Sequence, residues 1–304
     1  MNEFLRKFGS TQNFQIKDSE IESMKILISK SIILENSNKD TVDDLFEIEF
    51  KVFSQWGEDG IIQYIINKIP IENNCFIEFG VQNYKEANTR FLLMNNNWRG
   101  LIIDCNKDGI EYVKKDDIYW KYDLTAINAF ITKNNINQLF TENGFSGDIG
   151  LLSIDVDGND YWIWQAIEVV NPRIVICEYN SLFGKKSAVT IPYEDGYSRE
   201  KAHYSNIYYG ASLPALCMLS EEKGYDFIGC NNAGNNAFFV RKDLSTPFKK
   251  LNPKDGFKQR KFRESRDKNG HLNYLSVKEQ LQLIEDLWVF HIATNSMMKI
   301  RDLK

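Results

Sequence analysis

The fold is decided by Ile149-Gly150-Leu151-Leu152-Ser153-Ile154-Asp155-Val156-Asp157, an apolar stretch that becomes acidic at its carboxyl end. The same pattern recurs in Arg173-Ile174-Val175-Ile176-Cys177-Glu178-Tyr179-Asn180, in Phe76-Ile77-Glu78-Phe79-Gly80 and in Gly100-Leu101-Ile102-Ile103-Asp104. Continuous runs of branched apolar residues are typical of strands buried on both faces of a parallel sheet. We therefore expect the acids to meet at the carboxyl edge of one α/β sheet, where such folds bind ligands.

Strand-like and helix-like stretches alternate outward from these runs. Strands are expected at 75–80, 101–104, 119–123, 151–155 and 174–178, and helices follow them at 88–96, 108–115, 125–134 and 161–170. The helix 213–223 then precedes two strands, 225–230 and 237–241, joined by an Asn-rich turn. This order predicts a doubly wound, mostly parallel, seven-stranded sheet with its last strand antiparallel.

Three regions follow from this pattern. Residues 1–50 are expected to form an N-terminal helical cap, because Ile21, Met24 and Ile28 recur at helical spacing. Residues 51–245 form the core domain. Residues 246–304 form a C-terminal helical extension, with a basic stretch followed by a helix near 277–287.

Composition excludes several classes of protein. The chain has 304 residues and a net charge of −5, whereas dedicated nucleic-acid binders usually carry a basic surplus. No stretch is as apolar as a membrane span, and the N-terminus lacks the apolar core of a secretory signal. None of the five cysteines is in a C-x-x-C pair, which favours buried thiols in a reducing cytoplasm over disulfides or zinc ligands. The sequence leaves the oligomeric state open.

The first strand-to-helix turn argues against a dinucleotide. Gly80 is followed by Gln82 and Asn83, so the G-x-G-x-x-G motif is absent. Glu78 would repel a pyrophosphate about 5 Å away by roughly 3 kcal/mol at a dielectric near 20, but it suits the sulfonium and ammonium of S-adenosylmethionine. Asp104 is placed to accept hydrogen bonds from both ribose hydroxyls, and Asp123 from the adenine amino group. The alternative is that both acids only serve helix N-termini.

These residues resemble those of class I S-adenosylmethionine-dependent methyltransferases. Glu78-Phe79-Gly80 is similar to the first nucleotide motif, Asp104 to the second and Asp155 to the fourth-strand acid, while the closing strand pair is similar to the reversed last strand of that Rossmann-like fold. Ser54-Gln55-Trp56-Gly57-Glu58-Asp59 and Ile154-Asp155-Val156-Asp157-Gly158 resemble the FkbM-like branch, whose members often modify sugars and surface polysaccharides.

The resemblance covers about residues 50–245. It implies that Gln55, Glu78, Gly80, Asp104, Asp123 and Asp155 contact the cofactor. In one departure, Gln82 and Tyr84 replace the second and third glycines of the first motif.

The reacting end of the expected crevice is acidic. Neighbouring strands lie about 4.8 Å apart, so Asp155 and Glu178 would repel each other unless a proton, a basic side chain or a cation intervened. Asp157 and Asn180 follow two residues later on each strand. This all-oxygen set favours Mg²⁺ or another divalent cation, as in metal-dependent O-methyltransferases. Alternatively, Asp155 contacts the ligand ammonium and Asp157 only caps the next helix.

Methyl transfer to oxygen also needs a base. Asp155 and His203 are the candidate catalytic residues, and His203 is chosen because it lies in the long loop after the fifth strand, although an exposed loop histidine is the alternative. The basic stretch 254–268 is either a solvated face or a binding surface for a phosphate-bearing substrate such as a nucleotide sugar.

The sequence therefore predicts a cytoplasmic S-adenosylmethionine-dependent O-methyltransferase. Its acceptor is expected to be a small molecule, a sugar, nucleotide sugar or capsule precursor, with a phosphoramidate-type capsule modification included. We expect no nucleic-acid partner and no membrane span. The alternatives are an NAD(P)-dependent sugar-modifying enzyme and a non-catalytic protein that uses the fold for binding.

Overall fold

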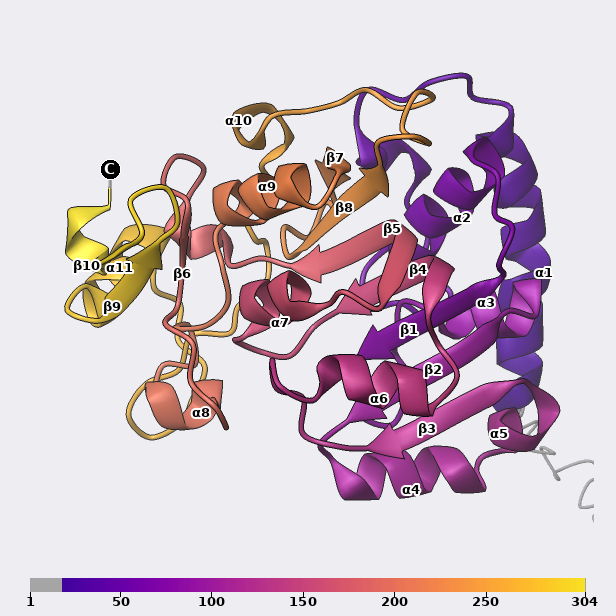
Figure 1. Cartoon of the computed structure of the whole chain (residues 1–304), viewed down its shortest axis with the longest axis horizontal. Coiled ribbons are helices and arrows are strands. Elements are labelled where there is room, and N and C mark those ends of the chain that lie inside the picture. Colours follow the sequence, from indigo (N-terminus) through magenta and orange to yellow (C-terminus); the bar gives the residue numbers. More distant parts are fainter. Residues whose placement is uncertain (1–17, 304) are drawn as a thin grey trace, which may run out of the picture.

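The structure is a computed structural model that describes residues 18–303. Within that range the chain forms a seven-stranded sheet in the order β3-β2-β1-β4-β5-β8-β7 (Figure 1). Its strands are β1 (Cys75–Phe79), β2 (Arg99–Asp104), β3 (Leu124–Asn128), β4 (Gly147–Ile154), β5 (Val170–Glu178), β7 (Tyr225–Cys230) and β8 (Asn236–Arg241). Only β8 runs against its neighbours β5 and β7. The predicted fold class, with the last strand of this sheet antiparallel, is confirmed.

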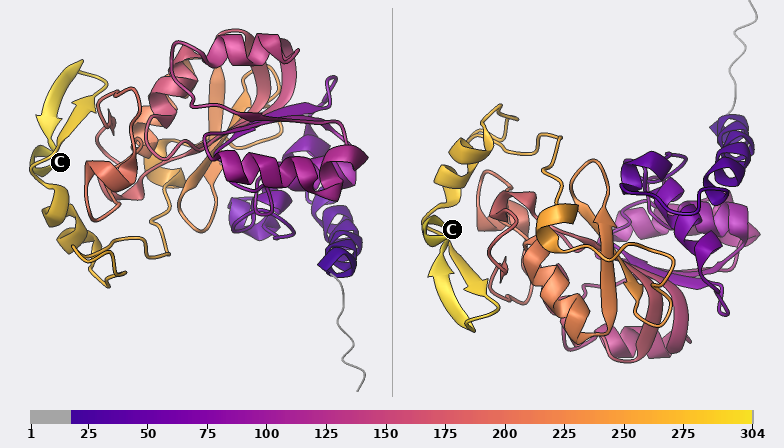
Figure 2. Two further views of the ribbon diagram at one scale, coloured as in Figure 1. Left: turned by 90° about the horizontal axis from the view of Figure 1, so that it is seen from below. Right: turned by 90° about the horizontal axis from the view of Figure 1, so that it is seen from above.

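Helices cover both faces of the sheet, as Figure 2 shows. The first face carries α2 (Glu58–Lys68), α3 (Arg90–Asn96), α4 (Lys107–Lys115) and α5 (Asp117–Lys121). The second carries α6 (Ile136–Glu142), α7 (Asp160–Ala166) and α9 (Leu213–Glu222). On β5, Ile174 and Ile176 pack on the first face, whereas Val175 and Cys177 pack on the second. A strand buried on both sides accounts for the continuous apolar runs in the sequence.

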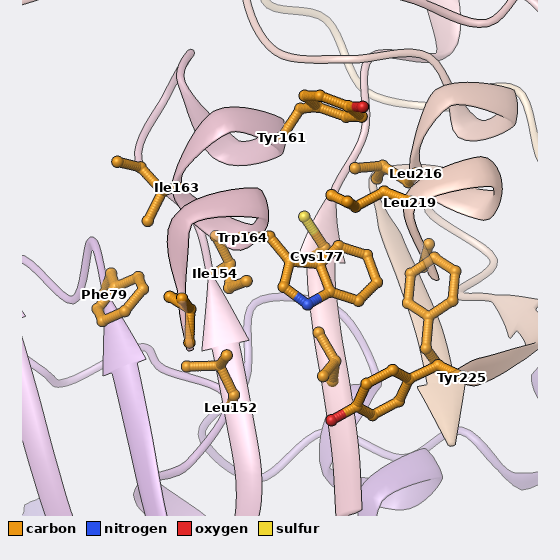
Figure 3. Packing of buried hydrophobic residues seen from close by; sticks show 14 of the residues in the cluster. Phe79, Leu152, Ile154, Tyr161, Ile163, Trp164, Cys177, Leu216, Leu219 and Tyr225 are labelled. Atoms are coloured by element: carbon orange, nitrogen blue, oxygen red, sulfur yellow. The ribbon is translucent and has the colours of Figure 1, made fainter. Parts of the chain in front are cut away.

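Trp164 of α7 is central to the second face (Figure 3). Its indole packs against Phe239 and Tyr225, with ring centroids 5.0 and 6.1 Å away, and only 2% of its surface is exposed. Figure 3 places it between β5 and the leucines of α9, which ties the loop after β4 to the last strands of the sheet.

The predicted third strand was wrong by several residues. Residues 117–121 form α5, which Asp116 caps through its side chain, and the strand is β3 instead. The predicted helix 125–134 therefore does not exist. β3 runs where that helix was expected, and its register pairs Asn128 with Asp104.

The two ends of the chain also differ from expectation. At the N-terminal end, α1 (Asp18–Ser37) and a 3₁₀ turn η1 (Leu45–Ile48) are the helical parts of the described cap, and the predicted helicity of residues 1–17 lies outside the described residues. The C-terminal extension is only partly helical. It contains α10 (Pro253–Gly256), α11 (Val277–Ile284) and η3 (Ile300–Asp302), and also β9 (Trp288–His291) and β10 (Ser296–Lys299).

β9 pairs with β6 (Val189–Thr190), from the long loop after β5, and β10 pairs with the other side of β9. That loop also holds η2 (Ser181–Phe183) and α8 (Arg199–Ala202). In Figures 1 and 2 this loop lies beyond the carboxyl edge of the main sheet together with α11, β9 and β10, whereas α10 lies beside α9 and β7. None of the described helices is both long and apolar enough to span a bilayer.

Candidate functional site

Two cavities meet at the carboxyl edge of the sheet. The Gln55 cavity, of about 140 Å³, is lined by Gln55, Glu78 and Asn236 among others. The Asp104 cavity, of about 320 Å³, is lined by Asp104, Phe130 and Ile131 among others. Gly80, Gln82 and Asp155 line both. Together they form one crevice of the size that binds small molecules, about 300–1,000 Å³.

The loop after β1 separates the two cavities and has an unusual backbone. Gly80, Gln82 and Tyr84 all have left-handed φ angles, of 69°, 49° and 59°. A Cβ on Gly80 would overlap the carbonyl oxygen of Asp155. Gln82 and Tyr84 therefore adopt the conformation that glycine usually supplies at such positions, although they are not glycines.

Asp104 holds this loop in place. One of its carboxylate oxygens accepts the N–H of Gln82 at 2.6 Å, and the other accepts the N–H of Asn106 at 2.6 Å. Each oxygen retains a second lone pair that can accept a hydrogen bond from a ligand. Beside it, Ile103, Phe130 and Ile131 give the cavity an apolar wall. Asp104 is thus positioned as predicted, at the tip of β2.

Two further expectations at this end were wrong. Asp123 precedes β3 and lies at the amino edge of the sheet, because the strand begins at Leu124 and not before it. It is therefore on the opposite side from the crevice, and Asn128 occupies the strand tip instead. Cys105 was expected to be buried, but it is exposed and lines the Asp104 cavity. All five cysteines lie within the described residues, and each is a free thiol.

Glu78 is buried and mainly supports the protein itself. Its Oε1 accepts the N–H of Asn88 at 2.8 Å, while Oε2 accepts the N–H of Thr89 at 3.0 Å and also the Thr89 hydroxyl. Burial raises the pKa of Glu78 to about 7, although these bonds oppose the rise. The carboxylate still lines the Gln55 cavity, so it combines an anchoring role with a negative wall.

The segment that carries Gln55 is held by two buried acids. Asp59 Oδ2 accepts the backbone N–H groups of residues 52, 53 and 54 at 2.7–2.9 Å, and Glu58 Oε2 accepts those of residues 56 and 57. Glu58 Oε1 also accepts the amides of Asn231 and Asn236. The sequence motif around Gln55 therefore serves mainly to shape this wall of the crevice.

An acidic triad lies at the crevice, and two of its members, Asp155 and Asp157, line the Asp104 cavity. Single carboxylate oxygens of Asp155, Asp157 and Glu178 all lie within 4.8 Å of one another, as the adjacency of β4 and β5 predicted. Burial, and then the negative neighbours, raise the pKa of both Asp155 and Glu178 well above their ordinary values. Glu178 Oε2 has no hydrogen-bond partner among the described residues. The triad therefore lacks part of its compensating positive charge.

Arg199 supplies the positive charge that the described residues do provide, and no sequence pattern pointed to it. Its guanidinium donates to Asp157 Oδ1 at 2.6 Å and to Glu264, and it lies 3.9 Å over the ring of Tyr209. It lowers the pKa values of Asp155 and Glu178 against the effect of burial. The loop after β5 brings Arg199 to the triad across a long sequence separation.

Asn180 does not belong to the triad. Its amide nitrogen donates to the carbonyl oxygens of Ile207 and Tyr209 at 2.9 and 3.0 Å, and its oxygen accepts the N–H of Leu182 at 3.1 Å. It is fully buried. The predicted role of Asn180 as a metal ligand was wrong, because its amide anchors the loop that follows β5.

His203 lines neither cavity of the crevice. Its Nδ1 lies 2.6 Å from Ser205 Oγ, its ring packs at a tilt against Tyr204, and partial burial lowers its pKa. It is half-buried, just after α8. The structure therefore offers the triad, and not His203, as the base next to the crevice.

A first prediction concerns the stability of the triad. The unfolded chain loses the Glu178 proton near pH 4.5, whereas the folded protein keeps it to higher pH, so stability falls as pH rises through this window. Each unit of such a pKa rise corresponds to about 1.4 kcal/mol. Glu178→Gln is therefore expected to raise Tm at pH 8 in EDTA by at least about 3 °C, and to change it little at pH 4.

Thermal unfolding at both pH values checks this expectation. Glu222→Gln removes the same charge from an exposed position and serves as the control. Added MgCl₂ at pH 8 is expected to stabilise the wild type but not Glu178→Gln. A lower Tm for Glu178→Gln at pH 8 would contradict the repulsion inferred for the triad.

Comparison with known proteins gives weak likenesses only. No family model matches the sequence, and no curated protein matches it. Similar solved structures include the N-terminal domain of EvdMO1 in the presence of SAH and D-fucose, with 11% identity and a TM-score of 0.39 over 74% of this chain and 95% of that chain. An O-methyltransferase family protein from Burkholderia thailandensis has 9% identity and a TM-score of 0.37 over 73% and 59%.

The citrinin polyketide synthase CMeT domain has 10% identity and a TM-score of 0.37 over 60% of this chain. This chain spans about half of that structure, 51%. Likenesses of this strength indicate neither a substrate nor an activity.

Proposed function

We propose that the protein is an S-adenosylmethionine-dependent O-methyltransferase. The observation that carries the proposal is the junction of the two cavities, where Gly80 passes against Asp155 and the left-handed loop after β1 is bonded to Asp104. The junction has a negative wall on one side and an apolar wall on the other. In a cationic sulfur nucleoside, the positively charged end suits the negative wall and the adenine suits the apolar wall. The pyrophosphate of a dinucleotide would instead be repelled by Glu78 and the triad.

The residues of the crevice fit such a nucleoside. The free lone pairs of Asp104 can accept both ribose hydroxyls, and the adenine can lie against Ile103, Phe130 and Ile131. The ammonium end then extends into the Gln55 cavity, toward Glu78. Gln55 and Asn236 offer further polar contacts there.

When bound, S-adenosylmethionine supplies a methyl group on a positively charged sulfur, which keeps the electron pair of the broken S–C bond. Asp155 lines both cavities at their junction, and burial increases the basicity of its carboxylate. We assign to Asp155 the removal of the proton from the acceptor hydroxyl as its oxygen bonds to the methyl carbon. The sulfur becomes neutral because it keeps the bond electrons, and the hydroxyl proton ends on Asp155.

Asp155, Asp157 and Glu178 would hold a divalent cation. All three offer carboxylate oxygens, which Mg²⁺ prefers, and the unpartnered Oε2 of Glu178 gives a cation a reason to bind. Such a cation would lower the pKa of the acceptor hydroxyl. Arg199 already provides positive charge near the same acids, so the thermal unfolding of wild type and Glu178→Gln in MgCl₂ tests whether a cation also binds there.

The acceptor class that we propose is a small hydroxylated molecule, such as a sugar, a nucleotide sugar or a capsule precursor. The loop after β5 lines the Asp104 cavity with polar and aromatic residues, including Tyr197 and Arg199, and the C-terminal extension pairs with this loop through β9 and β6. The predicted division into a cap, a core and an extension is retained as part of this proposal. The extension would then help to select the acceptor.

Calorimetric titration with S-adenosylhomocysteine tests the function directly. Saturable binding with one site per chain is expected, together with a rise in Tm at saturating ligand. NADH, titrated in parallel, is expected to give no signal, because Glu78 faces the position of its pyrophosphate. Binding of NADH but not of S-adenosylhomocysteine would replace the proposal with a nicotinamide-dependent enzyme, and binding of neither would favour a non-catalytic protein.

A further inference from the structure

A third cavity adjoins the crevice and is lined by arginines. This Arg263 cavity, of about 330 Å³, includes Arg199, Glu200, Asn206, Arg263 and Arg266 in its lining. It shares Asp157, Arg199 and Glu200 with the Asp104 cavity. A molecule that occupies it can therefore also reach the acidic triad.

The lining itself holds three arginines, Arg199, Arg263 and Arg266, and three acids, Asp157, Glu200 and Glu264, while a fourth arginine, Arg260, pairs with Glu264 from outside it. Arg199 pairs with Asp157 and Glu264, and Glu264 also pairs with Arg260, so two arginines balance two acids. Arg263 and Arg266 form no ion pair with any carboxylate in residues 18–303. Of the remaining acids that line the cavity, Glu200 alone opposes them within the described chain. With Arg260 counted, four arginines face three acids, so one net positive charge remains, and it resides on the two arginines that have no carboxylate partner.

Both unpaired arginines are held by contacts that leave their charge unneutralised. The Arg263 guanidinium lies 3.9 Å over the ring of Tyr274. Arg266 Nη1 donates to the carbonyl oxygen of Gly270 at 2.8 Å. A guanidinium that stacks on a ring or bonds a carbonyl keeps other N–H donors for a ligand, because it has five in all.

The backbone of this basic segment is also fixed. Arg260 N donates to Ser181 Oγ at 3.0 Å, Lys261 N to Ala233 O at 3.0 Å and Arg266 N to Ser205 O at 3.1 Å. Phe262 stacks on Trp56, with ring centroids 5.3 Å apart, next to Gln55. The segment is therefore tied across the crevice edge, and it is not simply a solvated face. Fixed donors lose less entropy when they bind a ligand.

We infer that the Arg263 cavity binds the phosphate group of the acceptor. This inference rests on the proposed function and narrows the acceptor to a phosphate-bearing molecule. Arg263 and Arg266 bind the phosphate oxygens through charge-assisted hydrogen bonds. The hydroxyl to be methylated then extends past Arg199 toward Asp155. Glu200 limits the affinity for multiply charged anions and favours an acceptor with hydroxyl groups that can donate to it.

Calorimetry at low ionic strength with inorganic pyrophosphate as the probe tests the inference. Arg263→Met/Arg266→Met is expected to weaken pyrophosphate binding at least about tenfold, because charge-assisted hydrogen bonds are lost. Lys185→Met/Lys186→Met changes the net charge equally at exposed positions and should leave it unchanged. Glu200→Gln should tighten it, and Arg263→Lys/Arg266→Lys should restore part of the loss.

The double variants of Arg263 and Arg266 and of the two lysines are also titrated with S-adenosylhomocysteine, whose affinity is expected to stay the same because none of these residues lines the Gln55 or Asp104 cavity. Two results would overturn the phosphate site but not the proposed function. The wild type could bind S-adenosylhomocysteine but not pyrophosphate, or Lys185→Met/Lys186→Met could lose as much pyrophosphate affinity as Arg263→Met/Arg266→Met. Pyrophosphate binding without S-adenosylhomocysteine binding overturns the proposed function and leaves an anion site. If malonate binds more tightly than pyrophosphate, the ligand of the Arg263 cavity is a carboxylate and not a phosphate.

Discussion

Asp104→Ala is expected to lower the affinity for S-adenosylhomocysteine by about 100-fold or more. Hydrogen bonds to a charged acceptor contribute about 1.5–3 kcal/mol each, and two ribose hydroxyls would lose them. The substitution also releases the N–H groups of Gln82 and Asn106, which loosens the loop between the two cavities. Calorimetric titration measures the change, and Asp104→Asn, which keeps the shape and part of the accepting capacity, should lose less.

Asp123→Ala is the matched control for this experiment. It makes the same chemical change one strand away, at the opposite edge of the sheet, so unchanged affinity is expected. A folded Asp104→Ala protein with wild-type affinity would contradict the ribose role. Equal losses in both variants would instead indicate a general effect of charge.

Gly80→Ala is expected to have the largest effect on the fold around the site. A left-handed φ costs a residue with a Cβ about 1–2 kcal/mol, and here the Cβ would also overlap the Asp155 carbonyl oxygen. The β1 and β4 tips must then separate. We expect a loss of well over 2 kcal/mol, a fall in Tm of more than about 5 °C and no detectable nucleoside binding.

Gly224→Ala separates the clash from the backbone strain. Gly224, just after α9, also has a left-handed φ, of 84°, but a Cβ there would meet nothing within 4 Å. It should lose only about 1–2 kcal/mol and keep its nucleoside affinity. If the two variants unfold at the same temperature, the close approach at Gly80 does not matter. Unfolding curves with and without S-adenosylhomocysteine provide both readouts.

The parallel core could be predicted from the sequence because burial on both faces requires continuous apolar strands. The runs ending at Asp104, Asp155 and Glu178 were located correctly, and with them the acids that meet at the carboxyl edge. The third strand was misplaced because Asp116 starts a short helix, whose cap outweighs the apolar content of residues 118–120. That shift moved Asp123 out of the site.

Roles that depend on long-range partners could not be predicted. Asn180 at a strand tip is chemically able to bind a metal, yet its amide groups are used by the loop at residues 207–209. Arg199 has no local signal, and only the path of the loop after β5 brings it to Asp157. His203 lies in the same loop and is directed to Ser205 instead.

Local sequence alone determined the strands, the chain order of the acids and the absence of a dinucleotide motif, because these depend on side-chain type and short-range spacing. Only the tertiary structure decided which acids are neutralised, which amides are already bonded and where the free arginines lie. Each of these depends on contacts between segments that are far apart in the chain. The adjacency of Arg263 and Arg266 to the crevice is such a contact, and it gives the acceptor proposal its physical basis.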